Sequence, residues 1–242
     1  MRLDRFLAET GFGTRSEVKK LIRSGRVVVE NSAKPTPELH IDCEKDSVTV
    51  DGIKVGYKKF IYLMMNKPQG CVSATYDRRL ETVIDYLPEE YLHFNPFPVG
   101  RLDIDTEGLL ILTNDGELSH RLLSPKKHIP KEYFVITDKP FTNADITAFR
   151  GGVTLDDGYK TLSSELEILS ETEPYSAKII IHEGKFHQVK RMAEAVGKTV
   201  VFLKRTKMNR LCLDENLAKG EIRELTEQEL ALLDTKNREE NL

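Results

Sequence analysis

Four carboxylates surround one short apolar run near the middle of the chain. They are Asp103, Asp105, Glu107 and Asp115, and the apolar run extends from residue 109 to residue 112. Ionised carboxylates at the edge of a core need a partner or a function, because burial disfavours their charge. An aspartate in this setting can act as a nucleophile, accept backbone hydrogen bonds in a turn, or bind a metal ion.

Two further uses of these carboxylates fit the sequence less well. Asp103, Asp105, Glu107 and Gly108 match positions 1, 3, 5 and 6 of a calcium loop, but Asn114 replaces the bidentate glutamate at position 12. Asp103 and Asp105 also lie too close along one strand to flank a glycosidic bond from both faces. The sequence therefore predicts no metal here, and it leaves a turn-capping role open beside a catalytic one.

The net charge of −3 conceals two basic segments. Residues 1–29 hold seven Lys and Arg against three acids, and residues 182–210 hold eight against two. Clustered positive charge favours contact with phosphates, although a solvated face is the simpler explanation for any one run. The phosphate contacts predicted in the first segment are Arg15, Lys19, Lys20 and Arg23.

Tyr133 stands at the start of a predicted strand, beside a basic approach. Residues 120–131 contain four Lys and Arg and no acid. A tyrosine at a strand end usually packs its ring in the core, whereas a ring beside phosphate-binding groups can stack on a nucleobase. Both readings stay open at this point.

A helix predicted over residues 186–196 carries the third candidate, Lys190. Val189, Met192 and Ala193 follow helical spacing and define its buried stripe. At about 100° per residue, Lys190 lies on the shoulder of that stripe and can lean into a cleft, while Arg191 faces solvent or phosphate. We interpret the neighbouring His187 and Gln188 as structural.

Local patterns indicate two unequal domains. Thr14 and Glu17 form a capping box for a helix over residues 14–24, and Gly25 ends it. Residues 27–29 and 47–50 read as strands, and residues 56–59 as a linker. Later helices are expected at 80–87, 116–123, 142–149 and 186–196, and strands at 60–65, 108–113, 132–137, 177–182 and 199–204.

Composition limits the protein class. The 242 residues are 39% apolar, enough for one substantial core. We expect a soluble, cytoplasmic protein, because the chain has no long apolar run and its first residues lack the apolar stretch of a secretory signal. Cys43, Cys71 and Cys212 are far apart, so neither disulfides nor structural zinc are expected.

Residues 1–50 resemble the S4-type RNA-binding module, with a helix from Arg2, a second basic helix and short strands. The rest of the chain resembles the pseudouridine synthases. The motifs that carry this resemblance are Lys-Pro-x-Gly from Lys67, Gly-Arg-Leu-Asp-x-Asp-Thr from Gly100, Lys-Glu-Tyr from Lys131 and His-Gln-Val-Lys-Arg-Met from His187. The RsuA branch, which modifies 16S ribosomal RNA of the small subunit, is favoured by the amino terminus over residues 1–6, the loop over residues 66–70, and Ser124-Pro125 followed by basic residues.

The resemblance assigns roles to residues. Asp103 would be the nucleophile, Tyr133 would stack on the target uracil, and Lys190 would form an ion pair with Asp103. Arg101 and Arg191 would contact RNA, and no cofactor or metal would be needed. Asp105 is better suited to holding the turn.

The resemblance also implies an α+β fold with a mixed, mostly antiparallel sheet. The expected domains are an S4-like domain over 1–56, a catalytic domain over 60–232 and a disordered tail over 233–242. The expected partner is ribosomal RNA, and the protein is expected to be a monomer. A large-subunit 23S enzyme and a non-catalytic ribosome assembly factor are the alternatives.

Overall fold

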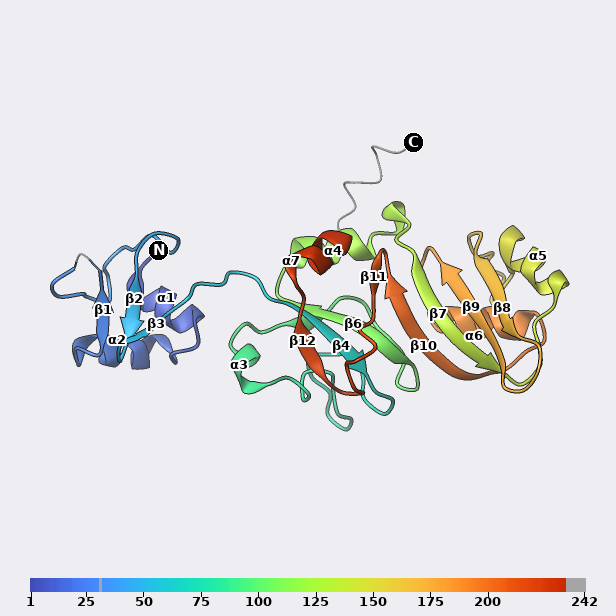
Figure 1. Cartoon of the computed structure of the whole chain (residues 1–242), viewed down its shortest axis with the longest axis horizontal. Helices are drawn as coiled ribbons and strands as arrows, with labels where there is room; N and C mark the ends of the chain where they lie inside the picture. The colour runs from blue at the N-terminus through green and yellow to red at the C-terminus, as the bar shows by residue number, and fades with distance from the viewer. Residues whose placement is uncertain (31, 234–242) are drawn as a thin grey trace. The chain divides into compact units, whose positions relative to one another are not determined.

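The computed structural model describes residues 1–30 and 32–233, and Figure 1 shows the course of the chain. The chain forms two compact units: Met1–Ile61 with Pro88–Pro96, and Tyr62–Leu87 with the chain from Phe97 onward. The predicted domain bounds, 1–56 and 60–232, stay a proposal. The last helix, α7 (Glu227–Leu233), includes the first residue of the predicted tail, and tail residues 234–242 lie outside the described residues.

The first unit combines two helices and a small antiparallel sheet in one core. They are α1 (Leu3–Glu9), α2 (Arg15–Arg23), β1 (Val27–Val29), β2 (Val48–Val50) and β3 (Ile53–Lys54), with the strand order β1-β2-β3. The predicted capping box of α2 is present, since Thr14 N donates to Glu17 Oε2 at 2.7 Å and Glu17 N donates to Thr14 Oγ1 at 3.4 Å. The core contains Leu3, Phe6, Leu7, Val18, Ile22, Val27, Val29, Val48 and Val50.

A larger sheet forms the frame of the second unit, in the order β12-β4-β6-β10-β7-β9-β8, with β5 beside β6 and β11 beside β10. The β6–β10 pair is parallel and the other pairs are antiparallel, so the sheet is mixed and mostly antiparallel, as predicted. The strands are β4 (Tyr62–Lys67), β5 (Phe97–Pro98), β6 (Glu107–Thr113), β7 (Lys131–Thr137), β8 (Glu165–Ser170), β9 (Tyr175–Ile181), β10 (Val200–Met208), β11 (Leu211–Cys212) and β12 (Ile222–Glu224).

Three predicted helices of this unit are confirmed within two residues at each end. They are α4 (Gly116–Leu123), α5 (Asn143–Gly151) and α6 (Gln188–Ala195), and a 3-10 turn, η1 (Pro125–Lys127), follows α4. A short helix, α3 (Glu89–Leu92), belongs to the first unit. The buried leucines of α4 and α7 join one core cluster with β6, and Figure 1 shows these two helices together near β11.

The helix predicted over residues 80–87 is wrong. This segment forms turns, because its backbone is bonded to another loop: Val72 N donates to Glu81 O at 2.9 Å and Val83 N donates to Val72 O at 3.0 Å. Asp85 accepts from both the backbone and the hydroxyl of Thr82, at 2.7 and 3.0 Å. These long-range bonds use backbone groups that a helix would need.

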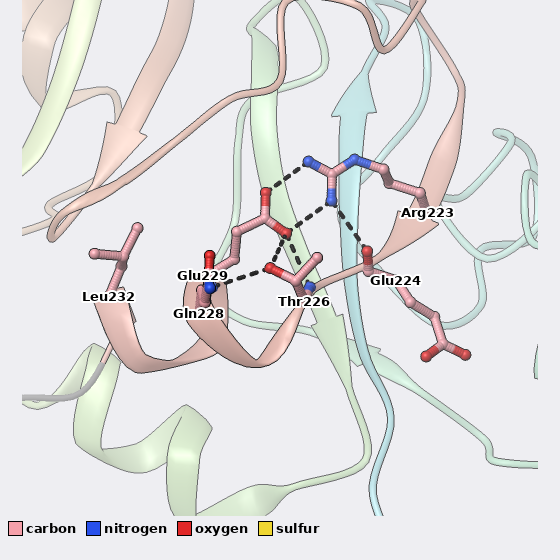
Figure 2. A pocket seen from close by; sticks show the side chains of 6 residues that line it. All are labelled: Arg223, Glu224, Thr226, Gln228, Glu229 and Leu232. Carbon is pink, nitrogen blue, oxygen red and sulfur yellow. Dashed lines mark hydrogen bonds and ion pairs between the residues drawn. The ribbon is translucent and has the colours of Figure 1, made fainter.

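The carboxyl end of the described chain is held to the sheet by Arg223 of β12. Its guanidinium donates to Glu229 of α7 at 2.7 and 2.9 Å (Figure 2). It also donates to Asp214 at 2.8 Å. Arg223 and Glu229 border a hollow of about 680 Å³, and none of the three predicted catalytic residues lines it. The hydrogen bonds from Arg223 outweigh partial burial and lower the pKa of Glu229 to about 2.

Candidate active site

The loop that carries Asp103 precedes β6 and is fixed by one buried lysine. Lys67, at the end of β4, is fully buried and donates its Nζ to the carbonyl oxygens of Asp103 and Thr106, both at 3.1 Å, and of Pro68 at 3.0 Å. Burial lowers the pKa of Lys67, and these carbonyls replace the water that it has lost. The Lys-Pro-x-Gly motif thus acts on the loop through its lysine.

Three further hydrogen bonds between the segment after Lys67 and this loop fix the loop. Ser73 Oγ donates to Leu102 O and accepts from Leu102 N, both at 3.0 Å. Gly70 N donates to Ile104 O at 2.8 Å. The residues on both sides of Asp103 are therefore bonded through their backbones, which leaves its side chain to face the site. We call Lys67, Gly70 and Ser73 the loop clamp.

Gly108 lets β10 approach the start of β6. It has φ 102°, and a Cβ added there would lie 2.2 Å from the carbonyl oxygen of Arg205. No side chain fits in that space. The parallel pair of β6 and β10 begins at this point, where Arg205 lies opposite Gly108.

Two of the four carboxylates serve the fold. Asp115 caps α4 by accepting from Leu118 N at 3.0 Å, and it also accepts from the Tyr62 hydroxyl at 2.9 Å. Glu107 is buried and accepts from Lys219 Nζ at 2.8 Å. Asp103 and Asp105 remain as candidates for chemistry.

Two nitrogen-bearing side chains from the start of α6 face Asp103. Lys190 Nζ lies 3.4 Å from Asp103 Oδ2, and His187 Nε2 lies 3.6 Å from Asp103 Oδ1. The Asp103 side chain is 28% exposed, so it is open to a substrate yet partly shielded from water. The structure thus brings together Asp103 and Lys190, which are 87 positions apart in the sequence.

Lys190 lies closer to Asp105 than to Asp103. Its Nζ donates to Asp105 Oδ1 at 2.5 Å. Partial burial disfavours the charge of Asp105, but the hydrogen bond and charge of Lys190 outweigh it and lower the pKa of this carboxyl. The lysine therefore bridges both aspartates, and Asp105 has an ion pair in addition to any role in the turn.

A buried network sets the start of α6. The carboxylate of Glu183 accepts from Tyr159 Oη at 2.7 Å and from Leu162 N and Gln188 Nε2, both at 2.9 Å. Gln188 Oε1 also accepts from Lys185 N at 2.8 Å. The structural role expected for Gln188 fits these bonds.

The sequence analysis gave His187 only a structural role, but the structure places it at the site, beside Asp103. It adopts φ 49°, which is uncommon for a residue other than glycine, and its ring faces Asp103. Residues three apart at the start of a helix share a face, so its spacing from Lys190 was the available signal.

Tyr133 lies within the sheet near the start of β6. It occupies β7 opposite Arg205 of β10, which in turn lies opposite Gly108 of β6. Two strand spacings of about 4.8 Å thus separate Tyr133 from the β6 backbone. The tyrosine is 7% exposed, so most of its ring packs in the core, and stacking on a uracil stays a prediction.

Comparisons with known proteins agree with this arrangement. The RNA pseudouridylate synthase family matches residues 61–195, more than half of the chain, and the S4 domain matches residues 1–32. The chain belongs to the RNA pseudouridine synthase family. It is therefore an enzyme that isomerises uridine in RNA, with an S4 domain at its amino terminus.

Individual relatives cover nearly the whole synthase. An uncharacterised RNA pseudouridine synthase of Bacillus subtilis is 51% identical, over 96% of this chain and 98% of that one. The ribosomal small subunit pseudouridine synthase A of Escherichia coli is 38% identical, over 96% and 99%. A crystal structure of a pseudouridylate synthase superposes with a TM-score of 0.68 at 37% identity, covering 97% of this chain and 100% of that chain.

The predicted RNA contacts of the synthase differ in their surroundings. Arg101, Arg15, Lys20 and Arg23 are exposed, and Lys19 lies 4.0 Å from Asp4. Arg191 is 16% exposed and forms ion pairs with Asp156 and Asp157. An RNA phosphate would have to compete with these two carboxylates, so contact by Arg191 stays a prediction.

Residues 1–30 and 32–233 offer two further observations, one on metal binding and one on membrane insertion. No group of three or more His, Cys, Asp or Glu side chains in these ranges is arranged to hold a metal ion. No helix in the same part of the chain is both long and apolar enough to cross a membrane.

Proposed function

We propose that this synthase converts one uridine of 16S ribosomal RNA to pseudouridine, acting as a cytoplasmic monomer. Support comes from relatives named ribosomal small subunit pseudouridine synthase A, which are 37–39% identical along almost their entire length. A large-subunit RNA substrate is the alternative, since the presence of an S4 domain indicates RNA binding but does not identify which RNA is bound.

The observation that carries the mechanism is the setting of Asp103. Its backbone is held by the loop clamp, and its carboxylate faces Lys190 and His187. We infer that Asp103 is the nucleophile, acting at the sugar C1′ or at the uracil ring. Lys190 would hold the two carboxylates in place against their mutual repulsion, because its ammonium contacts both.

The reaction moves one bond and one proton. The bond between N1 and C1′ breaks, the base turns, and a bond between C5 and C1′ forms while the C5 proton is lost and N1 gains one. The target must leave its stack to reach the aspartate. Tyr133 would then stack on the uracil, and Arg101 would contact the RNA beside it. No cofactor takes part in this proposal.

Tritium release from uracil-5-tritiated RNA tests the assignment of Asp103. Asp103→Asn should bind RNA and melt like the wild type but release no tritium, because an amide of similar shape is not a nucleophilic anion. Asp105→Asn is the matched control, and it should retain substantial turnover because Lys190 can still pair with Asp103. Tritium release by Asp103→Asn, or its loss only in a well-folded Asp105→Asn, would refute the assignment.

The RNA substrate needs a separate measurement. Pseudouridines should be mapped in 16S and 23S RNA after incubation with the synthase, using naked RNA and subunit particles in parallel. We expect a single new pseudouridine in 16S RNA. Modification of 23S RNA alone would favour the large-subunit alternative, and no modification in any sample would favour a non-catalytic role.

A further inference from the structure

Two large apolar side chains beside the active site are exposed, Ile104 and Phe186, and Phe186 is the more exposed of the two. Phe186, in the loop between β9 and α6, is 70% exposed. Its ring stacks on that of His187, with centroids 3.7 Å apart and planes inclined by 18°. An exposed ring of this size contributes little to the fold, so its position next to a functional site indicates a contact with something outside the chain.

Hydrogen bonds hold the loop that carries this ring. The Gln188 side chain donates to Glu183 and accepts from the backbone N of Lys185. The side chains of Gln188 and Glu183 are both buried. His187 takes its left-handed backbone conformation directly after Phe186. A ring presented by a rigid loop loses little entropy when it binds, which favours its use as a contact surface.

The stacked pair extends outward from the catalytic aspartate. His187 Nε2 lies 3.6 Å from Asp103 Oδ1, and Phe186 covers a face of the same imidazole. A nucleotide bound at Asp103 would lie next to His187, whose ring is stacked on that of Phe186. The exposed Lys185 precedes Phe186 in the chain, so positive charge lies beside the ring and suits RNA better than an apolar peptide.

We propose that Phe186 is a stacking platform for a nucleobase adjacent to the target uridine. The inference rests on the proposed function and deepens it by naming how the flanking RNA is held. Stacking on a ring tolerates any base, because every base has a flat π face. Phe186 would therefore strengthen binding of the substrate without reading its sequence.

Kinetics on ribosomal RNA test this platform through KM and kcat separately. Phe186→Ala should raise KM about tenfold and leave kcat within about twofold, since the loss of one base stack weakens binding by about that factor. Phe186→Tyr keeps the ring and should restore KM. Leu169→Ala is the control, because Leu169 is also an exposed apolar side chain but lies on β8. It should change neither KM nor kcat.

A fluorescent base locates the contact. The fluorescence of 2-aminopurine placed next to the target uridine should be quenched when the RNA binds wild type or Phe186→Tyr, and quenched less when it binds Phe186→Ala.

Equal KM values for Phe186→Ala and Leu169→Ala would overturn the proposal. A fall in kcat at unchanged KM would also overturn it, because the ring would then only position His187. If the wild type released no tritium from any ribosomal RNA, the proposed function itself would fail.

Discussion

Single charged groups decide the character of the active site. Lys190 faces two carboxylates at 2.5 and 3.4 Å, so one ammonium offsets two negative charges. Without it, Asp103 and Asp105 would repel each other in a partly shielded space. Lys67 works differently, because it bonds backbone carbonyls and fixes the loop. The two lysines of this site thus have separate roles. Lys190 neutralises the side-chain carboxylates, and Lys67 fixes the backbone of the loop.

Replacement of Lys190 tests the first task. Lys190→Met should lower kcat about 10- to 100-fold, since a hydrogen bond to a charged group is worth about 1.5–3 kcal/mol. Lys190→Arg keeps the positive charge and should retain much of the activity. Lys178→Met is the control, because Lys178 forms an ion pair on the surface of β9 with Glu167. Wild-type kcat in Lys190→Met would show that the lysine is dispensable for the chemistry.

The ends of several secondary-structure elements come together to form the site. β4 ends in Lys67, the loop before β6 carries Asp103, and α6 starts beside His187. The position of β4 in turn depends on β12, its antiparallel neighbour at the sheet edge. Arg223 of β12 is bonded to Glu229 of α7, so the last helix helps to hold the edge strand. Stability at this edge therefore supports the strand that fixes the catalytic loop.

The pH dependence of stability tests the bond between α7 and β12. Because the pKa of Glu229 falls from its usual 4.5 to about 2 in the folded state, its contribution is complete above pH 4.5 and is lost as the pH falls to 2. Glu229→Gln should lower the free energy of unfolding at pH 7 by about 2–3 kcal/mol.

Melting curves of wild type and Glu229→Gln at several pH values provide the measurement. The difference between the two proteins should be constant from pH 7 to about 5 and should shrink between about pH 4.5 and 2. Glu227→Gln alters an exposed acid in the same helix turn and should melt like the wild type. A difference that stayed constant down to pH 2 would mean that the charge of Glu229 contributes nothing.

At the scale of the whole molecule, the residues around Asp103 and the phosphate contacts predicted on α2 belong to different units. The S4 domain has exposed cations on α2, including Lys20 and Arg23, and it contains none of the residues around Asp103. Binding to phosphates releases counterions and depends steeply on salt, whereas the reaction at Asp103 does not. Changes in α2 should therefore affect KM and salt dependence rather than kcat.

A charge reversal on α2 tests this division. Replacing Lys19, Lys20 and Arg23 together by Glu should weaken RNA binding and reduce the slope of log K against log salt by about 2–3, because each lost phosphate contact contributes about 0.7–0.9. The matched control replaces Lys34, Lys45 and Lys54, which are exposed in the same unit, and has the same change in net charge. Equal slopes for both triple variants would exclude α2 from the RNA interface.

The sequence by itself determined the elements whose signals are local. The capping box of α2, the bounds of α4 and the strands β6 and β7 follow from residue types within one or two turns of chain. The ordered motifs were also sufficient to identify the family. Asp103 and Lys190 were predicted to meet because the family pattern pairs them, and the structure brings them within 3.4 Å.

Only the tertiary structure decided which hydrogen bonds and ion pairs form between segments that are far apart in the sequence. Residues 80–87 form turns because Val72 takes their backbone bonds, and no pattern within the segment reveals this. Lys190 lies closest to Asp105, and His187 turns toward Asp103, because the clamp at β4 and the Glu183 network fix both loops independently. Periodicity reports which face of a helix is buried, but the partner of a charged side chain depends on groups dozens of residues away.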